Sequence, residues 1–261
     1  MSRERGEERS AETGRPDAAC AARPSRLDPD VRRRQILDAA ISYFAEAGFT
    51  VQTRELTRRI GVSQPLLYRY FPSKQALIQA VFEAVFLNRW DDRWLVLLRD
   101  RAVPLRERLL RFYREYIAAT YQPEWLRIYM YSGLAGFGFN RDYVLRIVED
   151  KILTTVCEEL RRECLPPRDL RKAGGITPRE IELAWTLQGS AFYWVVRRSL
   201  FNSEPVLDFD TRFGDSIDLF LAGARAVYPG LMSTPAPVAG KRTPRGRPRV
   251  GLATQRRPRT S

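Results

Sequence analysis

The amino-acid sequence predicts an all-α fold in two parts, a small N-terminal helical domain and a larger C-terminal helical body. Apolar residues recur at spacings of three and four along most of the 261 residues, as they do on the buried faces of helices. No stretch alternates apolar and polar residues in the manner of a half-buried strand. We therefore expect helices throughout the folded region.

Composition divides the chain into four segments. Residues 1–27 and 231–261 have few large apolar side chains, so burial does not offset the entropy of ordering them, and we expect both to be disordered. Between these tails we expect an N-terminal domain over residues 28–78 and a larger domain over residues 79–230.

The first predicted helix begins at Asp28 and Pro29 and ends at Gly48. Aspartate caps a helix N-terminus through its side chain, proline is tolerated in the first turn, and glycine commonly follows the last turn. Its buried stripe consists of apolar residues at helical spacing: Ile36, Leu37, Ala40, Ile41 and Phe44.

A helix-turn-helix is expected next. The second helix covers residues 53–60, Gly61 turns the chain, and Ser63 caps a third helix that has a proline in its first turn. Two short helices joined by a glycine-containing turn form this motif. Leu67 and Phe71 are four residues apart and are expected to share the buried face, which leaves another face for a polar partner.

Six further helices are expected in the larger domain. Four of them precede a loop at residues 165–175 that is rich in proline, glycine and charge, and two follow it. The first helix after the loop has a capping box formed by Thr177 and Glu180. The six helices cover residues 73–99, 104–120, 124–136, 140–164, 178–201 and 208–227.

Histidine is missing from the sequence. Its absence removes Ser-His-Asp and Cys-His catalysis, imidazole acid-base chemistry and most zinc sites. There is also no glycine-rich phosphate loop, no nucleophile elbow and no acidic cluster with metal-ligand spacing. We expect no enzyme activity, no cofactor and no metal.

Cysteine usage and hydropathy indicate a cytoplasmic protein. The three cysteines are odd in number and lack the spacing of a disulfide framework, which fits a reducing compartment. The longest uncharged run, 226–240, has 15 residues, whereas a membrane-spanning helix needs roughly 20 apolar residues. The first 30 residues lack the apolar core of a signal peptide, and no membrane partner is expected.

Positive charge is concentrated in two blocks. The net charge is +13; residues 31–80 hold eight basic and three acidic side chains, and residues 232–261 hold eight basic side chains and no acidic one. The region between the blocks is close to neutral. Separate basic blocks of this kind indicate a polyanionic partner such as a nucleic acid.

Two stretches resemble a known family. "RRQILDAAISYFAEAGF" at residues 33–49 and "TRELTRRIGVSQPLLYRYFPSKQALI" at residues 53–78 closely resemble the DNA-binding domain of the TetR family of bacterial transcriptional regulators. The resemblance implies a TetR-like fold: a three-helix helix-turn-helix domain that binds double-stranded DNA, and a helical domain for ligand binding and dimerisation. A two-fold homodimer of this kind reads a palindromic operator.

Under this resemblance, the second helix of the motif enters the major groove. Gln64 is expected to hydrogen-bond adenine, and Pro65 and Leu66 to touch a thymine methyl group. Tyr68 and Tyr70 are suited to phosphate contacts that fix register, and packing in the core is an alternative for Tyr70. The DNA contacts expected in the folded region are Thr53, Arg54, Ser63, Gln64, Pro65, Leu66, Tyr68, Tyr70 and Lys74.

The larger domain is rich in aromatic residues. Most such residues form core, but ligand pockets are also apolar and aromatic with a few polar groups. We expect an apolar or aromatic small-molecule effector. The expected lining is Trp125, Tyr129, Phe137, Trp185, Gln188 and Phe192.

The last two helices carry small residues, among them Gly189 and Gly223, that allow close helix approach. The family resemblance makes these helices the interface of a homodimer.

The C-terminal tail contains "PRGRP" at residues 244–248, which is similar to the core of an AT-hook. Arg245 and Arg247 are then expected to enter the minor groove of A·T-rich DNA, where negative potential is concentrated. A basic tail with only unspecific attraction for DNA is the alternative.

The leading hypothesis is a transcriptional repressor that a small ligand releases from its operator, although activation of transcription is also open. The alternative is an architectural, dimeric DNA-binding protein without an effector. Release from operator DNA by a ligand separates the two hypotheses.

Overall fold

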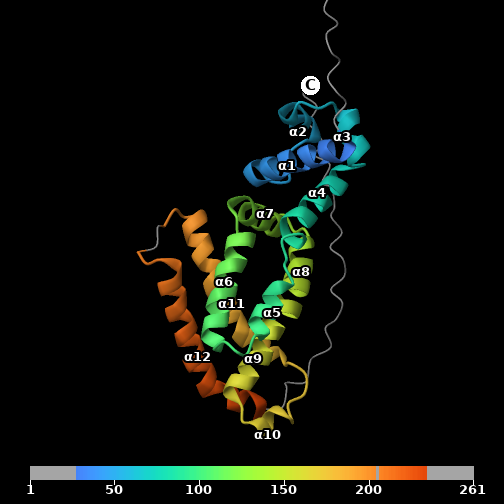
Figure 1. The fold of residues 1–261 in the computed structure, drawn as a ribbon. Helices are drawn as coiled ribbons and strands as arrows, with labels where there is room; N and C mark the ends of the chain where they lie inside the picture. Colours follow the sequence, from blue (N-terminus) through green and yellow to red (C-terminus); the bar gives the residue numbers. More distant parts are fainter. Residues whose placement is uncertain (1–27, 204–205, 234–261) are drawn as a thin grey trace, which may run out of the picture.

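The computed structural model describes residues 28–203 and 206–233, and all the regular structure in these ranges is helical (Figure 1). The N-terminal domain lies at one end of an elongated helical body, and a single helix leads from the domain into the body. The predicted all-α fold with two parts is therefore confirmed.

Four helices build the N-terminal domain: α1 (Pro29–Ala47), α2 (Thr53–Ile60), α3 (Gln64–Tyr70) and α4 (Lys74–Phe82). α1 and α3 begin where the predicted caps lie. The Asp28 carboxylate accepts a hydrogen bond from the Asp30 amide at 2.8 Å, and the Ser63 hydroxyl accepts one from the Leu66 amide at 3.3 Å. Gly61 ends α2 in the left-handed region with a φ of 73°, a conformation that favours glycine.

The core of this domain is formed by residues from all four helices. Leu67 and Phe71 are buried, as predicted. Thr57 is also buried, and its hydroxyl donates to the Arg54 carbonyl at 2.9 Å. The hydroxyl is therefore hydrogen-bonded within α2, and Thr57 is tolerated in the core. The other main core residues are Ile36, Ala40, Phe44, Leu56 and Leu77.

Between residues 83 and 233, the described part of the chain forms a C-terminal body of eight helices: α5 (Arg93–Arg99), α6 (Leu105–Thr120), α7 (Pro123–Leu134), α8 (Phe139–Tyr143), α9 (Thr154–Cys164), α10 (Pro167–Leu170), α11 (Pro178–Ser199) and α12 (Phe209–Ser233). Two π-helical segments extend them. Glu83–Leu87 continues α4, and Val144–Leu153 joins α8 to α9. α12 packs against both α6 and α11 along one side of the body (Figure 1). The capping box of Thr177 and Glu180 at the start of α11 is present as predicted.

The single helix predicted over residues 73–99 is wrong. The helix ends at Leu87, and α5 begins only at Arg93. Side chains between them bond locally: the Trp90 indole donates to the Asp92 carboxylate at 2.7 Å, and the Asp91 carboxylate accepts from the Arg93 amide at 2.9 Å. These bonds compete with the helical pattern and allow a turn.

Two further boundaries differ from prediction. The expected loop 165–175 contains the short helix α10, which starts at a proline in its first position. α12 continues past residue 227, through Pro229, to Ser233, so the last helix is longer than the predicted range 208–227. The Tyr228 hydroxyl anchors this end by donating to the Glu180 carboxylate at 2.9 Å. The predicted tail 1–27 lies outside the described residues, and so do residues 234–261 of the predicted tail 231–261.

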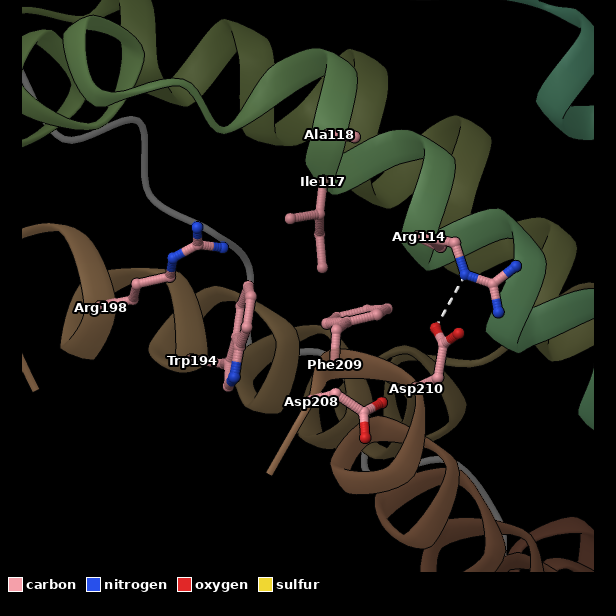
Figure 2. A pocket seen from close by; sticks show the side chains of 8 residues that line it. All are labelled: Arg114, Ile117, Ala118, Trp194, Arg198, Asp208, Phe209 and Asp210. Carbon is pink, nitrogen blue, oxygen red and sulfur yellow. Dashed lines mark hydrogen bonds and ion pairs between the residues drawn. The ribbon is translucent and has the colours of Figure 1, made fainter. Parts of the chain in front are cut away.

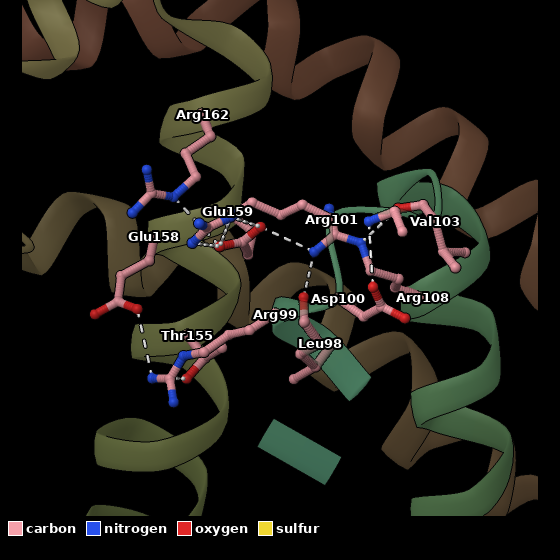
Figure 3. Close-up of polar contacts among 11 residues, drawn as sticks. Leu98, Arg99, Asp100, Arg101, Val103, Arg108, Thr155, Glu158, Glu159 and Arg162 are labelled. Carbon is pink, nitrogen blue, oxygen red and sulfur yellow. Dashed lines mark hydrogen bonds and ion pairs between the residues drawn. The ribbon is translucent and has the colours of Figure 1, made fainter. Parts of the chain in front are cut away.

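Buried ion pairs tie the helices of the body together (Figure 3). The Glu159 side chain on α9 is 2% exposed and accepts hydrogen bonds from Arg108 at 2.8 Å and from Arg101 at 3.0 Å. Burial alone would raise the pKa of Glu159, but the two guanidinium groups outweigh burial and lower that pKa. Glu159 is therefore an anion that joins α9 to α6 and to the turn after α5.

A second buried pair joins α9 to α11. The Arg161 guanidinium donates to both oxygens of Glu180, at 2.5 and 2.7 Å, and to the carbonyls of Gly174 and Gly175. Cys157 lies beside this pair, and burial raises the pKa of its thiol to about 12. The thiol is therefore unreactive at neutral pH.

A seam of aromatic rings joins the two domains. The rings of Phe49, just after α1, and Phe137, just after α7, meet edge to face with centroids 5.2 Å apart. Gly48 has a φ of 73°, and a Cβ atom there would lie 3.7 Å from the Tyr131 ring on α7. α1 and α7 are thus in direct contact, which links the position of the N-terminal domain to that of α7.

Candidate nucleic-acid interface and small-molecule pocket

α3 has an exposed face with polar side chains that can contact DNA. Gln64, Pro65 and Tyr68 are exposed on it, whereas Leu67 is 1% exposed and points into the core. Gln64 is the first residue of the helix and follows the Ser63 cap. A helix that enters the major groove reads bases with residues at its N-terminal end, so the position of Gln64 suits a base contact.

Thr53 and Tyr68 come together across the helix-turn-helix. The Thr53 hydroxyl, in the first turn of α2, lies 3.1 Å from the Tyr68 hydroxyl on α3. Both belong to the predicted set of DNA contacts, and the structure brings their hydroxyl groups to one point. Two hydroxyl groups near the N-terminus of a helix suit a single phosphate oxygen.

Lys74 has a structural role that the sequence does not reveal. Its ammonium donates to the carbonyls of Phe49 at 2.7 Å and Val51 at 2.6 Å, so it fastens the loop between α1 and α2 to the start of α4. Burial lowers the pKa of Lys74, whereas the two carbonyls favour the charged form. A phosphate contact would use the third N–H bond of the ammonium.

The remaining predicted DNA residues differ in exposure. Arg54 is exposed, the Ser63 hydroxyl is engaged as a cap, Leu66 is half-buried, and Tyr70 is half-buried against the core. Arg245 and Arg247 lie outside the described residues.

Arg69 is not among the DNA contacts predicted from the sequence. It is exposed next to Tyr68 on α3. Among the described residues, neither Arg54 nor Arg69 forms an ion pair, whereas Arg58 pairs with Glu55 and Arg59 with Glu46. Arg54 and Arg69 thus supply uncompensated positive charge on the helix-turn-helix.

The predicted effector lining is brought together in part. Trp125 and Tyr129 stack with centroids 5.0 Å apart, and the Phe192 ring lies 5.5 Å from Tyr129. Phe137 instead contacts Phe49 at the domain seam. Trp185 is half-buried and has no ring contact with this cluster among the described residues.

Gln188 organises the polar part of the same core. Its amide oxygen accepts from the Tyr113 hydroxyl at 3.1 Å, and its amide nitrogen donates to the Tyr121 hydroxyl at 3.0 Å. Tyr116 and Tyr143 hydrogen-bond to each other nearby. The Trp125 indole N–H is buried and has no partner within the described part of the chain, so one donor in this core is left for a further acceptor.

A pocket of about 330 Å³ opens between α6, α11 and α12 (Figure 2). Ile117, Trp194 and Phe209 surround its apolar part, and the Arg114–Asp210 ion pair, 2.8 Å long, closes one end. The full lining is Arg114, Ile117, Ala118, Trp194, Arg198, Asp208, Phe209 and Asp210. None of the six predicted lining residues belongs to this pocket. The sequence does not indicate it because its lining comes from two stretches, 114–118 and 194–210, that lie far apart in the chain.

The outer faces of α11 and α12 provide room for another helix. Gly189 and Gly223 are both exposed, and an added Cβ atom would have no neighbour within 4 Å at either position. Tyr193 on α11 and Leu219 on α12 are large apolar residues that are 55% and 78% exposed. Exposed apolar side chains beside small residues are typical of a helix-packing interface.

Neither a membrane helix nor a metal cluster is found in the ranges 28–203 and 206–233. No helix there is long and apolar enough to cross a membrane. Acidic, cysteine and histidine side chains there form no group of three or more that could hold a metal ion.

The chain is similar to known bacterial regulators in sequence and in structure. Residues 36–81 match the family described as bacterial regulatory proteins, tetR family. The class D tetracycline repressor of Escherichia coli is 30% identical over 90 residues, which cover 31% of this chain and 41% of the repressor. An HTH-type transcriptional repressor of Mycobacterium tuberculosis is 36% identical over 136 residues, which cover 51% of this chain and 66% of that protein.

The fold is shared beyond these segments. The crystal structure of a TetR-like transcriptional regulator from Rhodococcus sp. RHA1 superposes with a TM-score of 0.52 at 20% identity, covering 80% of this chain and 100% of that chain. At this identity the likeness concerns the fold alone. The matched segments thus span about two fifths and two thirds of these two relatives, while the structural match covers both domains.

Proposed function

The chain belongs to the TetR family of bacterial regulatory proteins, and we propose that it regulates transcription by binding a palindromic operator as a homodimer. The observation that carries this proposal is the surface of α3. Its first residues are exposed and polar, its buried face is locked into the domain, and uncompensated arginines flank it. The chain would act in the cytoplasm, where the chromosome lies, and no catalytic role is proposed.

The exposure and the hydrogen bonds of the side chains on this surface suggest which DNA groups each of them contacts. Gln64 reads a base, with Pro65 and Leu66 beside it, because these residues begin α3. Thr53 and Tyr68 bind one phosphate through their paired hydroxyl groups, and Arg54 and Lys74 add positive charge. Tyr70 contributes less to binding because it is half-buried.

Selection of bound fragments from a randomised DNA library tests the proposal. The purified chain should retain palindromic sequences, with half-sites about one DNA turn apart or somewhat more. Gln64→Ala should relax the preference at one position per half-site by about 1–3 kcal/mol. A library that returns no common sequence would contradict the operator proposal, and an unchanged preference in Gln64→Ala would contradict the role of Gln64.

We further propose that a small molecule controls DNA binding, so that the chain acts as a repressor that its effector releases. Support comes from the partly assembled aromatic cluster with its unmatched Trp125 donor, and from the direct contact of α7 with α1. A ligand shifts the equilibrium only if it binds one arrangement of the domains better than the other. DNA affinity that no ligand changes would favour the architectural alternative.

A further inference from the structure

The pocket between α6, α11 and α12 is one end of a longer groove. It continues along α6 into a hollow of about 520 Å³ that reaches the turn between α6 and α7. Both parts share the lining residues Ile117, Ala118, Trp194 and Arg198, so they are contiguous. We call the combined space the α6–α11 groove.

One part of the groove is apolar. Ile117 projects from α6 toward the rings of Trp194 and Phe209, which meet edge to face with centroids 5.1 Å apart (Figure 2). Aromatic and branched side chains around a space of a few hundred Å³ suit the hydrocarbon body of a small ligand.

The charges of the groove are unequal at its two ends. At the end near α12, Asp210 is paired with Arg114 and Asp208 is bonded within its own turn, so both acids are already occupied. At the end near α7, Arg127 and Arg198 are exposed, and no described carboxylate forms an ion pair with either. Unpaired guanidinium groups beside an apolar wall favour an anionic head group.

One buried donor in the groove wall is unsatisfied. Trp194 is 7% exposed, and its indole N–H has no hydrogen-bond partner in the described ranges. Buried polar groups are nearly always hydrogen-bonded, so this N–H is a candidate donor to a ligand acceptor.

We propose that the α6–α11 groove binds an organic monocarboxylate with an apolar body. The carboxylate lies between Arg127 and Arg198, and the body extends along Ile117 toward the rings of Trp194 and Phe209. Regulation by this ligand rests on the function proposed above, whereas its binding does not.

The groove is connected to the DNA-binding domain through Tyr121. This residue lines the end near α7, and its ring contacts Trp125 in the first turns of α7 with centroids 4.6 Å apart. The far end of α7 reaches α1 through the ring contact of Phe137 with Phe49. A ligand that pushes on the α6–α7 turn therefore acts on the helix against which α1 rests.

Calorimetric titration of the full chain, without DNA, tests the site. The probes are 1-naphthylacetate and decanoate, and their matched neutral controls are 1-naphthylacetamide and decanamide. We expect at least one carboxylate to bind, and its amide to bind about tenfold or more weakly because the charge-assisted hydrogen bonds are lost. If neither carboxylate binds at millimolar concentration, or if the amides bind equally well, the proposal is overturned.

Variants locate the binding. Arg198→Gln should weaken carboxylate binding about tenfold, whereas Arg179→Gln, an exposed and unpaired arginine in the first turn of the same helix, should leave it unchanged. Ala118→Trp places a large ring at an exposed position that lines both parts of the groove, and it should abolish binding without a cost in folding. Equal binding by Arg198→Gln and Arg179→Gln, or full binding by Ala118→Trp, assigns the ligand to another place.

Operator binding in the presence of the carboxylate separates this inference from the proposed function. Fluorescence anisotropy with the selected operator should show an affinity change that Ala118→Trp loses. If the carboxylate binds with the expected pattern but operator affinity does not change, its role as effector is refuted and DNA binding stands. If the chain binds no operator under any condition, the proposed function fails while the ligand site remains measured.

Discussion

Lys74 holds the loop that precedes the helix-turn-helix, and Lys74→Met tests how much this contact contributes. Methionine keeps the length and most of the apolar stem but loses two hydrogen bonds from a charged donor, at 2.7 and 2.6 Å. Each such bond contributes about 1.5–3 kcal/mol. Lys74 is only half-buried and the freed carbonyls regain water, so we expect the lower end of the sum for the two bonds, a loss of about 3 kcal/mol in the free energy of unfolding.

Urea denaturation followed by far-ultraviolet circular dichroism measures this loss. Tryptophan fluorescence is a poor probe here, because all five tryptophans lie outside the N-terminal domain. Hydrogen exchange of amides in residues 47–56 should rise in the variant, since this loop loses its anchor. The control is Lys172→Met, an exposed lysine with no ion pair among the described residues. A loss no larger than that of the control refutes the anchoring role.

The same variant tests the phosphate contact. If the third N–H bond of Lys74 meets a phosphate, the slope of log affinity against log salt should decrease by about 0.9 in Lys74→Met. Weaker operator binding with an unchanged slope would mean that Lys74 acts only through the loop.

Three further predictions concern other parts of the chain. Burial alone would raise the pKa of Glu180, but hydrogen bonds led by that of Arg161 lower it. Glu180→Gln should therefore lower the free energy of unfolding by about 3–5 kcal/mol near neutral pH. This difference from the wild type should shrink as the pH falls below 4.5, the ordinary pKa of a glutamate carboxyl, because the wild-type carboxylate is then protonated. Denaturation at several pH values measures it. Gly223→Trp should convert the dimer into a monomer in a sedimentation experiment, because the added ring separates the packed helix backbones. A wild-type chain that sediments as a monomer at micromolar concentration would contradict the dimer proposal. Removal of residues 240–261 should weaken DNA binding more for operators flanked by A·T tracts than for operators flanked by G·C tracts. Equal losses of affinity at one salt concentration would mean that the tail attracts DNA only through unspecific charge.

Local signals allowed most helix ends to be predicted. Asp28, Ser63 and Thr177 cap helices through bonds within three residues, and Gly61 adopts the left-handed conformation that glycine tolerates best. These features depend on neighbours in the sequence, so a pattern is sufficient to find them.

Features that depend on distant residues were missed. Lys74 meets carbonyls more than twenty positions earlier, and α12 passes Pro229 because the buried Tyr228 hydroxyl is held by Glu180. The α6–α11 groove draws its walls from four helices: α6, α7, α11 and α12. Aromatic composition predicts a ligand site in the larger domain, but it does not reveal which rings line a cavity and which pack in the core.

The aromatic seam between the domains has a consequence for modular engineering. A chimeric sensor that joins residues 28–81 of this chain to the body of a relative would transplant Phe49 without its partner Phe137. It would also set Gly48 against whatever replaces the Tyr131 ring. The chimera would then bind its operator, but ligand binding would change its DNA affinity only weakly, because the aromatic contact between the DNA-binding domain and the ligand-binding body would be lost. Grafting an aromatic residue at the position of Phe137 together with the domain should restore the linkage.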